Sequence, residues 1–243
     1  MSVKRFVSLL FTLFLTALIT QSVVAQTTEE AQVAPVPVSL EASHDAVLVG
    51  SFYPAAETAP ALLLMHMNRG SRAQWDPILP DLLDAGYNVL AIDLRGQGES
   101  SGTVSMVEAI NDVAVWLEWL RAQPTVDPAR VAVMGGSVGA NLAIVGCSND
   151  PACVTVVALS PGVNYYRVVT TTALPALEDR PVLVVASRRD SPSGQDVQTL
   201  LSDSTGDFTV QMYTGGVHGT DMLTSEPTLI PTILLWLHLH LDA

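Results

Sequence analysis

The residue types needed for nucleophilic catalysis by a serine occur in the order Ser137, Asp190 and His218 along the 243-residue chain. Ser137 is the centre of the stretch GGSVG, which matches the pattern G-x-S-x-G with Gly135 and Gly139 as its outer glycines. A serine hydroxyl is a poor nucleophile on its own, so it needs a base, and the base needs a carboxylate that orients it. The three residues therefore predict a nucleophile, an orienting acid and a general base.

The sequence around Ser137 predicts a tight turn between a strand and a helix. Residues 131–134 are apolar and typical of a buried strand, and residues 139–146 are typical of a helix. Glycines suit such an elbow because side chains two residues away from the serine would collide there. The hydroxyl would stand near the N-terminus of the helix, where backbone N–H groups stabilise developing negative charge. The alternative is that Ser137 only caps the helix after a glycine turn.

His218 is the histidine best placed to act as the base. It lies in a glycine-rich loop directly after the last predicted strand, which covers residues 208–215. His66 follows a buried strand that precedes the serine, and the other three histidines are expected at the edge of the fold or on the last helix. The alternative is a structural role, which is more common for a single histidine.

Asp190 is the best candidate for the orienting carboxylate. It comes three residues after the predicted strand at 181–187, between the serine and the histidine in the chain. Asp196 is expected inside the following helix, with its side chain toward solvent. Asp221 lies only three residues past His218 and suits a helix cap better. The role of the chosen carboxylate would be to hold the tautomer of the imidazole and to stabilise the imidazolium.

Strands and helices alternate from residue 45 to the end. The predicted strands cover residues 46–53, 59–67, 87–94, 131–134, 154–160, 181–187 and 208–215. The predicted helices cover residues 77–86, 106–122, 139–146, 194–203 and 221–241. This alternation predicts an α/β fold with a mostly parallel sheet, helices on both faces and the chemistry at the carboxyl ends of the strands. We expect a single domain over residues 38–243.

The first residues predict export. Lys4 and Arg5 precede an apolar run at residues 6–19, and small residues that signal peptidases accept follow it. Residues 1–25 are therefore predicted to be a cleaved signal peptide and residues 26–37 a flexible leader, so that the mature protein is secreted or periplasmic. The alternative is an uncleaved N-terminal membrane anchor, because the apolar stretch approaches the roughly 20 residues of a spanning helix.

Composition limits the partners. The chain carries 24 acidic residues against 11 Lys and Arg, a formal net charge of −13, so nucleic acid and anionic membrane surfaces would repel it. The last predicted helix, at 221–241, is too short and too interrupted by Pro231 to span a membrane. We therefore expect a small-molecule substrate, no nucleic-acid partner and no membrane insertion of the mature chain.

The two cysteines, Cys147 and Cys153, flank a turn-rich Ser-Asn-Asp-Pro stretch. In an exported protein such a close pair readily forms a disulfide, which would clamp a connection in the fold. The alternative is a pair of small buried residues. We expect no metal site here because no histidine or further cysteine stands nearby.

The order of Ser137, Asp190 and His218 on alternating strands and helices resembles the α/β-hydrolase family, from about residue 40 to the end. The stretch AIDLRGQGES, at residues 91–100, is similar to the D-x-R-G-x-G-x-S loop of these hydrolases, which shapes the wall of their site. The resemblance is closest to compact serine esterases and dienelactone-hydrolase-like members. True dienelactone hydrolases use a cysteine nucleophile, so the serine argues against that specific activity.

Many α/β-hydrolases insert a lid between the strand after the elbow helix and the strand before the acid. Here that gap is residues 161–180, which has room for a loop or one helix but not for a large cap domain. Tyr165, Tyr166 and Leu174 could form an apolar wall over the site or belong to the core. The short gap implies an open cleft suited to small or flexible esters.

In the same family a His-Gly-X segment after the third strand supplies one N–H that stabilises the oxyanion. This chain has His66-Met67-Asn68 there, and the missing glycine leaves open whether Met67 or Asn68 donates. The position favours Asn68, with the backbone N–H of Val138 as the second donor. His66 itself would only brace the loop.

The resemblance implies an exported serine hydrolase that cleaves carboxylic esters of short to medium chain length through an acyl-enzyme, without a metal or organic cofactor. Cleavage of peptides or amides by the same three residues is an alternative. A catalytically silent binding protein on the same fold is another.

Overall fold

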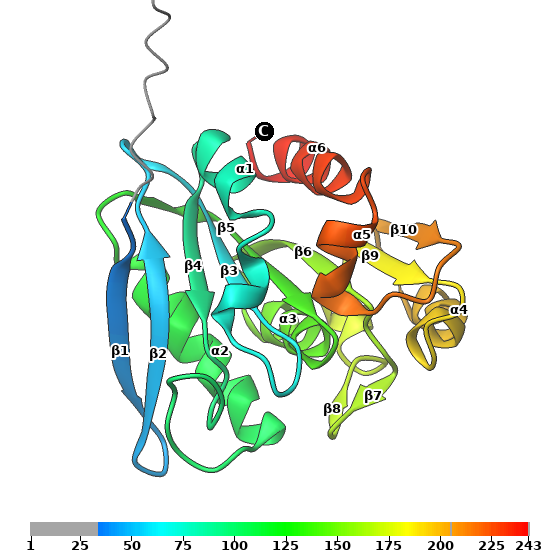
Figure 1. The fold of residues 1–243 in the computed structure, drawn as a ribbon, viewed down its shortest axis with the longest axis horizontal. Coiled ribbons are helices and arrows are strands. Elements are labelled where there is room, and N and C mark those ends of the chain that lie inside the picture. Colours follow the sequence, from blue (N-terminus) through cyan, green and yellow to red (C-terminus); the bar gives the residue numbers. More distant parts are fainter. Residues whose placement is uncertain (1–33, 205, 243) are drawn as a thin grey trace, which may run out of the picture. The chain divides into compact units, whose positions relative to one another are not determined.

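The computed structural model describes residues 34–204 and 206–242, which form a sheet of eight strands and the helices around it (Figure 1). The strands of the sheet are β1 (Val36–Ala42), β2 (Ala46–Tyr53), β3 (Ala59–Met65), β4 (Asn88–Ile92), β5 (Val126–Gly136), β6 (Cys153–Leu159), β9 (Val182–Ser187) and β10 (Phe208–Tyr213). Their order in space is β1-β2-β4-β3-β5-β6-β9-β10. From β4 to β10 in this order the neighbours are parallel, whereas β2 pairs antiparallel with both β1 and β4. The predicted, mostly parallel sheet is confirmed.

Helices cover both faces of the sheet. One face carries α2 (Met106–Arg121), α3 (Val138–Asn149) and α4 (Ser193–Asp203), and the other carries α1 (Leu79–Asp84), α5 (Met222–Ser225) and α6 (Leu229–Leu241). Successive strand residues alternate between the two cores, so that Leu63 packs with α2 and α3 while Leu64 packs with α1 and α6. Both leucines are fully buried, and each such side chain contributes roughly 1.5–3 kcal/mol. The strands are continuously apolar because both of their faces are covered.

The parallel strands bring distant parts of the chain to one edge of the sheet, which we call the carboxyl edge. Parallel strands end on the same side, so the loops that follow β3, β4, β5, β9 and β10 meet there. These loops contain, in chain order, His66, Asp93, Ser137, Asp190 and His218. The three residues of the predicted catalytic set therefore lie at the same edge.

Strand β1 corrects the predicted leader at 26–37. Val36 and Pro37, the last two residues assigned to that leader, belong to β1 and pair with β2. A proline is tolerated there because β1 is an edge strand, in which every second N–H along the strand points away from the sheet. The predicted signal peptide at 1–25 and the leader up to residue 33 lie outside the described residues.

The predicted helix at 221–241 forms as two helices. Glu226, between α5 and α6, is extended (φ −116°, ψ 95°) because Pro227 follows it and a proline disfavours helical geometry in the residue before it. Pro231 lies in the first turn of α6, where a proline breaks no helical hydrogen bond. Across residues 34–204 and 206–242, no helix has the length and hydropathy to cross a membrane.

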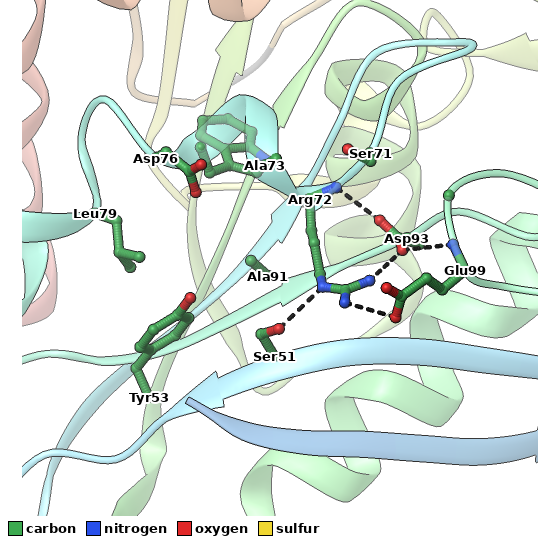
Figure 2. A pocket seen from close by; sticks show the side chains of 12 residues that line it. Ser51, Tyr53, Ser71, Arg72, Ala73, Asp76, Leu79, Ala91, Asp93 and Glu99 are labelled. Carbon is green, nitrogen blue, oxygen red and sulfur yellow. Dashed lines mark hydrogen bonds and ion pairs between the residues drawn. The ribbon is translucent and has the colours of Figure 1, made fainter. Parts of the chain in front are cut away.

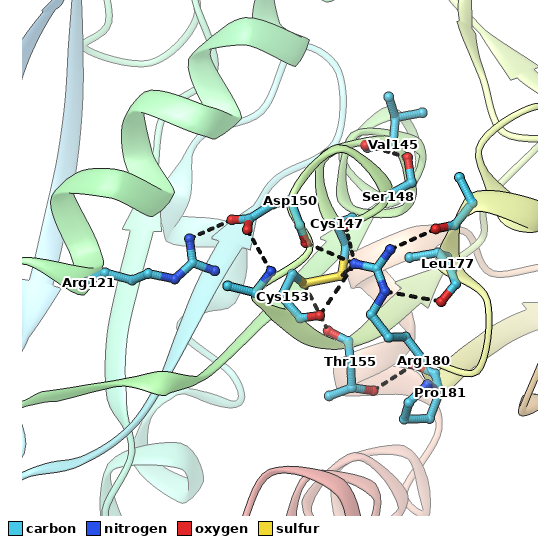
Figure 3. The surroundings of a disulfide bond; sticks show 12 residues. Arg121, Val145, Cys147, Ser148, Asp150, Cys153, Thr155, Leu177, Arg180 and Pro181 are labelled. Atoms are coloured by element: carbon cyan, nitrogen blue, oxygen red, sulfur yellow. Dashed lines mark hydrogen bonds and ion pairs between the residues drawn. A yellow bond between two sulfur atoms is a disulfide. The ribbon is translucent and has the colours of Figure 1, made fainter.

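The predicted disulfide joins Cys147 of α3 to Cys153 of β6 and closes the turn between them (Figure 3). The guanidinium of Arg180 donates to the backbone carbonyls of Cys147 at 2.5 Å and of Asp150 at 2.8 Å. Arg121 of α2 donates to the carboxylate of Asp150 at 2.5 Å. We call these five residues the disulfide corner. Because Cys153 begins β6, the corner lies at the opposite edge of the sheet from the predicted catalytic residues.

Candidate active site

Ser137 occupies a strained turn between β5 and α3. Its φ of 54° and ψ of −119° lie outside the regions that L-residues favour, at a cost of about 1–3 kcal/mol. A Cβ at Gly135 would lie 2.0 Å from the oxygen of Gly139, and a Cβ at Gly139 would lie 2.3 Å from the oxygen of Met65. The N–H of Ser137 donates to the carbonyl of Leu159 at 2.8 Å and holds the turn against β6. Close backbone contacts therefore require glycine on both sides of the serine.

The imidazole of His218 is hydrogen bonded to the carboxylate of Asp190. Nδ1 of His218 lies 2.8 Å from one carboxylate oxygen and 2.9 Å from the other. Asp190 is only 6% exposed and accepts the bond, so Nδ1 carries the proton and Nε2 is left as an acceptor. This is the tautomer that a general base requires.

The loop that carries His218 passes directly beside the elbow. A Cβ at Gly219 would lie 3.5 Å from the nitrogen of Ser137, and a Cβ at Gly136 would lie 3.2 Å from the nitrogen of Thr220. In the part of the chain that the structure describes, the side chain of His218 bonds to the carboxylate and not to the serine hydroxyl. A bond between nucleophile and base is often long until substrate is bound. The fold thus places the histidine loop against the serine.

His66 connects the ends of β3 and β4 and is fully buried. The N–H of Leu94 donates to its Nε2 at 2.9 Å, so Nδ1 carries the proton and donates to the carbonyl of Met67 at 2.6 Å. Burial lowers the pKa of His66, which keeps the ring neutral. Both ring nitrogens are engaged in these bonds, so His66 serves the architecture of the loop.

Met67 takes the place of the glycine that the resemblance led us to expect. A Cβ at Gly219 would lie 2.4 Å from its sulfur, and a Cβ at Gly136 would lie 3.2 Å from its Cγ. The methionine fits because these two neighbours have no side chains. Its backbone N–H donates to Oε1 of Gln74 at 3.0 Å, so that donor is already occupied, whereas Asn68 is the next residue along the loop.

A cleft of about 850 Å³ opens beside Asn68. Its walls are the loop after β3, the loop after β4 that leads into α2, and a hairpin of β7 (Asn164–Tyr165) and β8 (Val168–Val169). The lining residues are Asn68, Arg69, Gly70, Gly96, Gln97, Gly98, Val104, Ser105, Met106, Val107, Tyr166 and Arg167. The amide of Asn68 donates to the hydroxyl of Tyr166 at 2.7 Å and ties two of these walls together. We call this space the Asn68 cleft.

The β7–β8 hairpin was not predicted from the sequence. Its turn residues, Tyr166 and Arg167, have φ values of 51° and 72°, which such turns usually reserve for glycine or asparagine. The proposed apolar wall is divided, because Tyr166 lines the cleft and Leu174 is buried in the core. The ring of Tyr165 stands edge-on to the imidazole of His218, with 6.4 Å between ring centroids, and burial raises the pKa of this tyrosine.

A network of charges fixes the loop after β4 (Figure 2). The carboxylate of Asp93 accepts the backbone N–H groups of Arg72 at 2.7 Å and Glu99 at 2.9 Å, and it pairs with the guanidinium of Arg72. That guanidinium also donates to Glu99 at 2.8 Å and to Ser51 at 2.9 Å. A Cβ at Gly98 would lie 2.3 Å from the carboxylate carbon of Asp93, so only glycine fits there. The D-x-R-G-x-G-x-S loop is thus held as a wall of the Asn68 cleft, with a separate pocket of about 350 Å³ bordering the network.

Asp196 has a structural contact that the sequence did not predict. The expectation that its side chain faces solvent is wrong, because its carboxylate accepts the N–H of Val163 at 2.8 Å. This bond ties α4 to the segment that leads into the β7–β8 hairpin. Within the described ranges, no three His, Cys, Asp or Glu side chains are placed to hold a metal ion.

Known proteins resemble this chain in sequence and in structure. The model of the X-Pro dipeptidyl-peptidase family (S15 family) matches residues 26–214. The uncharacterized protein YfhR of Salmonella typhi is 28% identical over 182 residues, which are 67% of this chain and 61% of YfhR, so the chain spans about three fifths of that relative. An esterase of Pyrococcus furiosus has a TM-score of 0.75 at 20% identity and covers 85% of this chain and 91% of its own. A dienelactone hydrolase from Anabaena variabilis has a TM-score of 0.65 at 17% identity, with coverages of 85% and 99%. At these identities the structural likeness shows the fold alone.

Proposed function

Because the chain belongs to the X-Pro dipeptidyl-peptidase (S15) family of hydrolases and has the α/β-hydrolase fold, we propose that it is an exported serine hydrolase of small carboxylic esters. The observation that carries this proposal is the hydrogen bond between His218 and Asp190 beside the strained Ser137 elbow. A serine on such an elbow, followed in the chain by the acid and the histidine, is the arrangement by which this fold performs acyl transfer.

In the proposed reaction the oxygen of Ser137 attacks the carbonyl carbon of the ester while Nε2 of His218 takes the hydroxyl proton. The bond to the alcohol oxygen then breaks, and His218 gives that proton to the leaving alcohol, so that an acyl-serine remains. Water attacks the acyl carbon and gives a proton to His218, which returns it to the serine oxygen as the carboxylic acid departs. Asp190 holds the Nδ1 proton and stabilises the imidazolium in both halves.

The oxyanion of the tetrahedral intermediate would be bound by the backbone N–H groups of Val138 and Asn68. Val138 begins α3, where the helix dipole also favours negative charge. Asn68 is preferred to Met67 because the Met67 N–H is occupied by Gln74. Losing one such donor typically costs about 2.7–4 kcal/mol of transition-state stabilisation. These steps need no metal or organic cofactor.

The disulfide supports the proposed export. Disulfides persist in oxidising compartments outside the cytosol, and Cys147 and Cys153 are linked. The signal peptide at 1–25 remains a prediction from the sequence. Expression of the full chain followed by N-terminal sequencing of the exported protein tests it, with Gln26 as the expected first residue.

A fluorophosphonate probe tests the hydrolase directly. It should label the wild-type protein and not the Ser137→Ala variant, because it reacts with an activated serine. Hydrolysis of 4-nitrophenyl esters with acyl chains of two to sixteen carbons should then be fastest for the short and medium chains. A folded wild-type protein that takes no label would end the proposal and favour a silent binding protein.

Cleavage of peptides is the second candidate, and the family match favours it. The free amino terminus of a peptide needs a carboxylate in the site, and the described residues that line the Asn68 cleft include no Asp or Glu. We therefore expect 4-nitrophenyl butyrate to be cleaved faster than alanyl-prolyl-4-nitroanilide. The opposite order would make the protein a peptidase.

A further inference from the structure

The Asn68 cleft has a charge opposite to that of the whole chain. The chain carries 24 acidic and 11 basic residues, yet the cleft lining has no Asp or Glu among the described residues and has two arginines. Arg69 comes from the loop after β3, and Arg167 comes from the turn of the β7–β8 hairpin. Both side chains are exposed. Two walls of the cleft therefore each contribute one positive charge.

These two charges are not neutralised inside the protein. Carboxylates pair with four other arginines, which are Arg72, Arg95, Arg121 and Arg130. Arg180 is held by backbone carbonyls. Throughout 34–204 and 206–242, no ion pair or side-chain hydrogen bond engages the guanidinium of Arg69 or Arg167. The same holds for Arg188 and Arg189, which directly precede the orienting acid. The arginines that remain available are thus gathered at the carboxyl edge.

Gln97 fixes the backbone of Arg69 in the wall of the cleft. Its Oε1 accepts the backbone N–H of Arg69, which sets the amide so that Nε2 is the free end. Gln97 is 8% exposed and lines the cleft, and its Nε2 has no partner in the described part of the chain. Nε2 itself has almost no accessible surface, so the contribution of Gln97 to the cleft is the position of the Arg69 backbone.

The remaining lining offers apolar surface. Val104 is 53% exposed and Val107 is 40% exposed, and Met106 lies between them at the start of α2. An exposed apolar strip beside unpaired cations suits a ligand that combines a short hydrocarbon chain with an anionic end.

We propose that the Asn68 cleft binds a carboxylate, and that the preferred substrates are esters in which a short apolar chain separates the reacting carbonyl from that carboxylate. Arg69 and Arg167 bind the carboxylate oxygens, since guanidinium groups match their planar geometry. The choice of substrate rests on the proposed function, whereas the binding of the anion does not.

Binding to the Ser137→Ala variant tests the proposal without turnover. Calorimetry should give a dissociation constant for monomethyl glutarate about tenfold lower than for neutral dimethyl glutarate. The ratio of the dimethyl to the monomethyl dissociation constant should fall toward one as NaCl is added. Arg69→Gln and Arg167→Gln should each move the ratio toward one. Gln97→Glu keeps the acceptor for the Arg69 N–H but adds a negative charge to the lining of the cleft, so it should lower the ratio as well.

The matched control is Arg130→Gln, which removes one positive charge from a residue that is paired with Asp127 and does not line the cleft. This variant should keep the wild-type ratio. Equal dissociation constants for the two ligands, no binding of either ligand, or a ratio unaffected by the substitutions at Arg69 and Arg167 would overturn the proposal.

Hydrolysis by the active protein identifies the part of the ester that carries the charge. 4-Nitrophenyl hydrogen glutarate and its methyl ester place the charge in the acyl part, while the butyryl esters of 4-hydroxybenzoate and of methyl 4-hydroxybenzoate place it in the alcohol part. Faster hydrolysis of the charged member of either pair supports the proposal, and equal rates within both pairs contradict it. If the anion binds selectively but no ester is cleaved, the inference about the cleft stands and the proposed hydrolysis fails.

Discussion

Helix α3 connects two regions of different design, because it begins directly after Ser137 and carries Cys147 in its last turn. At its first end the serine has strained backbone geometry, and the neighbouring imidazole of His218 is partly exposed. At its other end a disulfide closes the turn, and the guanidinium of Arg180 binds two backbone carbonyls of that turn. At the carboxyl edge the Asp190 bond leaves Nε2 of His218 as a free acceptor, whereas at the disulfide corner Arg180 binds the backbone carbonyls of the turn. The proposed chemistry and the covalent clamp thus lie at opposite ends of the same helix.

Removal of the proposed nucleophile is the strongest test of this division. Ser137→Ala should lower kcat/KM for 4-nitrophenyl butyrate by on the order of 10⁵-fold. Ser137→Gly should lose as much activity and be more stable than Ser137→Ala by about 1 kcal/mol, because glycine adopts a positive φ without strain. Ester hydrolysis and urea unfolding of the two variants measure both effects. Activity that survives in Ser137→Ala would remove the serine from the mechanism.

Removal of the disulfide tests the opposite region. The variant with Cys147→Ser and Cys153→Ser should lose about 2 kcal/mol of unfolding free energy, as expected for a short closed loop. The kcat/KM of the folded variant should stay at the wild-type value, because the corner lies at the other edge of the sheet. Urea unfolding and ester hydrolysis of the same samples check this, with reduced wild-type protein as the control. A folded variant with low activity would mean that the corner positions the elbow through α3.

His66 provides a pH test of the carboxyl edge. Burial lowers the pKa of His66 in the folded protein, so below about pH 6.5 the unfolded chain binds more protons than the folded one. Stability should therefore decrease as the pH falls from 7 to 5, and the decrease should be smaller in His66→Gln. Urea unfolding over this pH range gives the slopes, and His44→Gln, at an exposed position, is the control. Identical slopes for wild type and His66→Gln would exclude this histidine as their source.

Tyr165→Phe should have the smallest effect. The hydroxyl of Tyr165 is buried and has no hydrogen-bond partner among the described residues, so its removal should leave stability unchanged or raise it by up to about 1 kcal/mol. Tyr165→Ala also removes the ring beside His218 and should lower both stability and kcat. Thermal unfolding and ester hydrolysis separate the two variants. A large loss in Tyr165→Phe would show that the hydroxyl acts on the substrate.

The parts of the fold that the sequence predicts are those with a local pattern. Continuous apolar runs identify the parallel strands because both faces of the sheet are covered, as Leu63 and Leu64 illustrate. The elbow is also local, since Gly135 and Gly139 stand at fixed distances from the serine. The split between α5 and α6 was missed, although Pro227 was a usable signal for it.

The parts that the sequence does not predict depend on contacts between distant residues. Strand β1 is defined by its pairing with β2, and the β7–β8 hairpin is too short to show an alternating pattern. Asp196 was misplaced because its partner, Val163, is 33 residues away in the chain. The Asn68 cleft is a further case, since Asn68 and Tyr166 are 98 residues apart and meet only in the folded chain.

The contacts of Arg180 indicate which segments of the protein unfold together. Its guanidinium also donates to the carbonyls of Ala176 at 2.8 Å and Leu177 at 3.0 Å, so one side chain joins the turn after α3 to the segment that enters β9. The cysteine bridge and this arginine restrain the same few peptide groups, so their contributions overlap, and losing both should cost less than the sum of the separate losses. The segment before β9 should therefore open together with that turn as one cooperative unit.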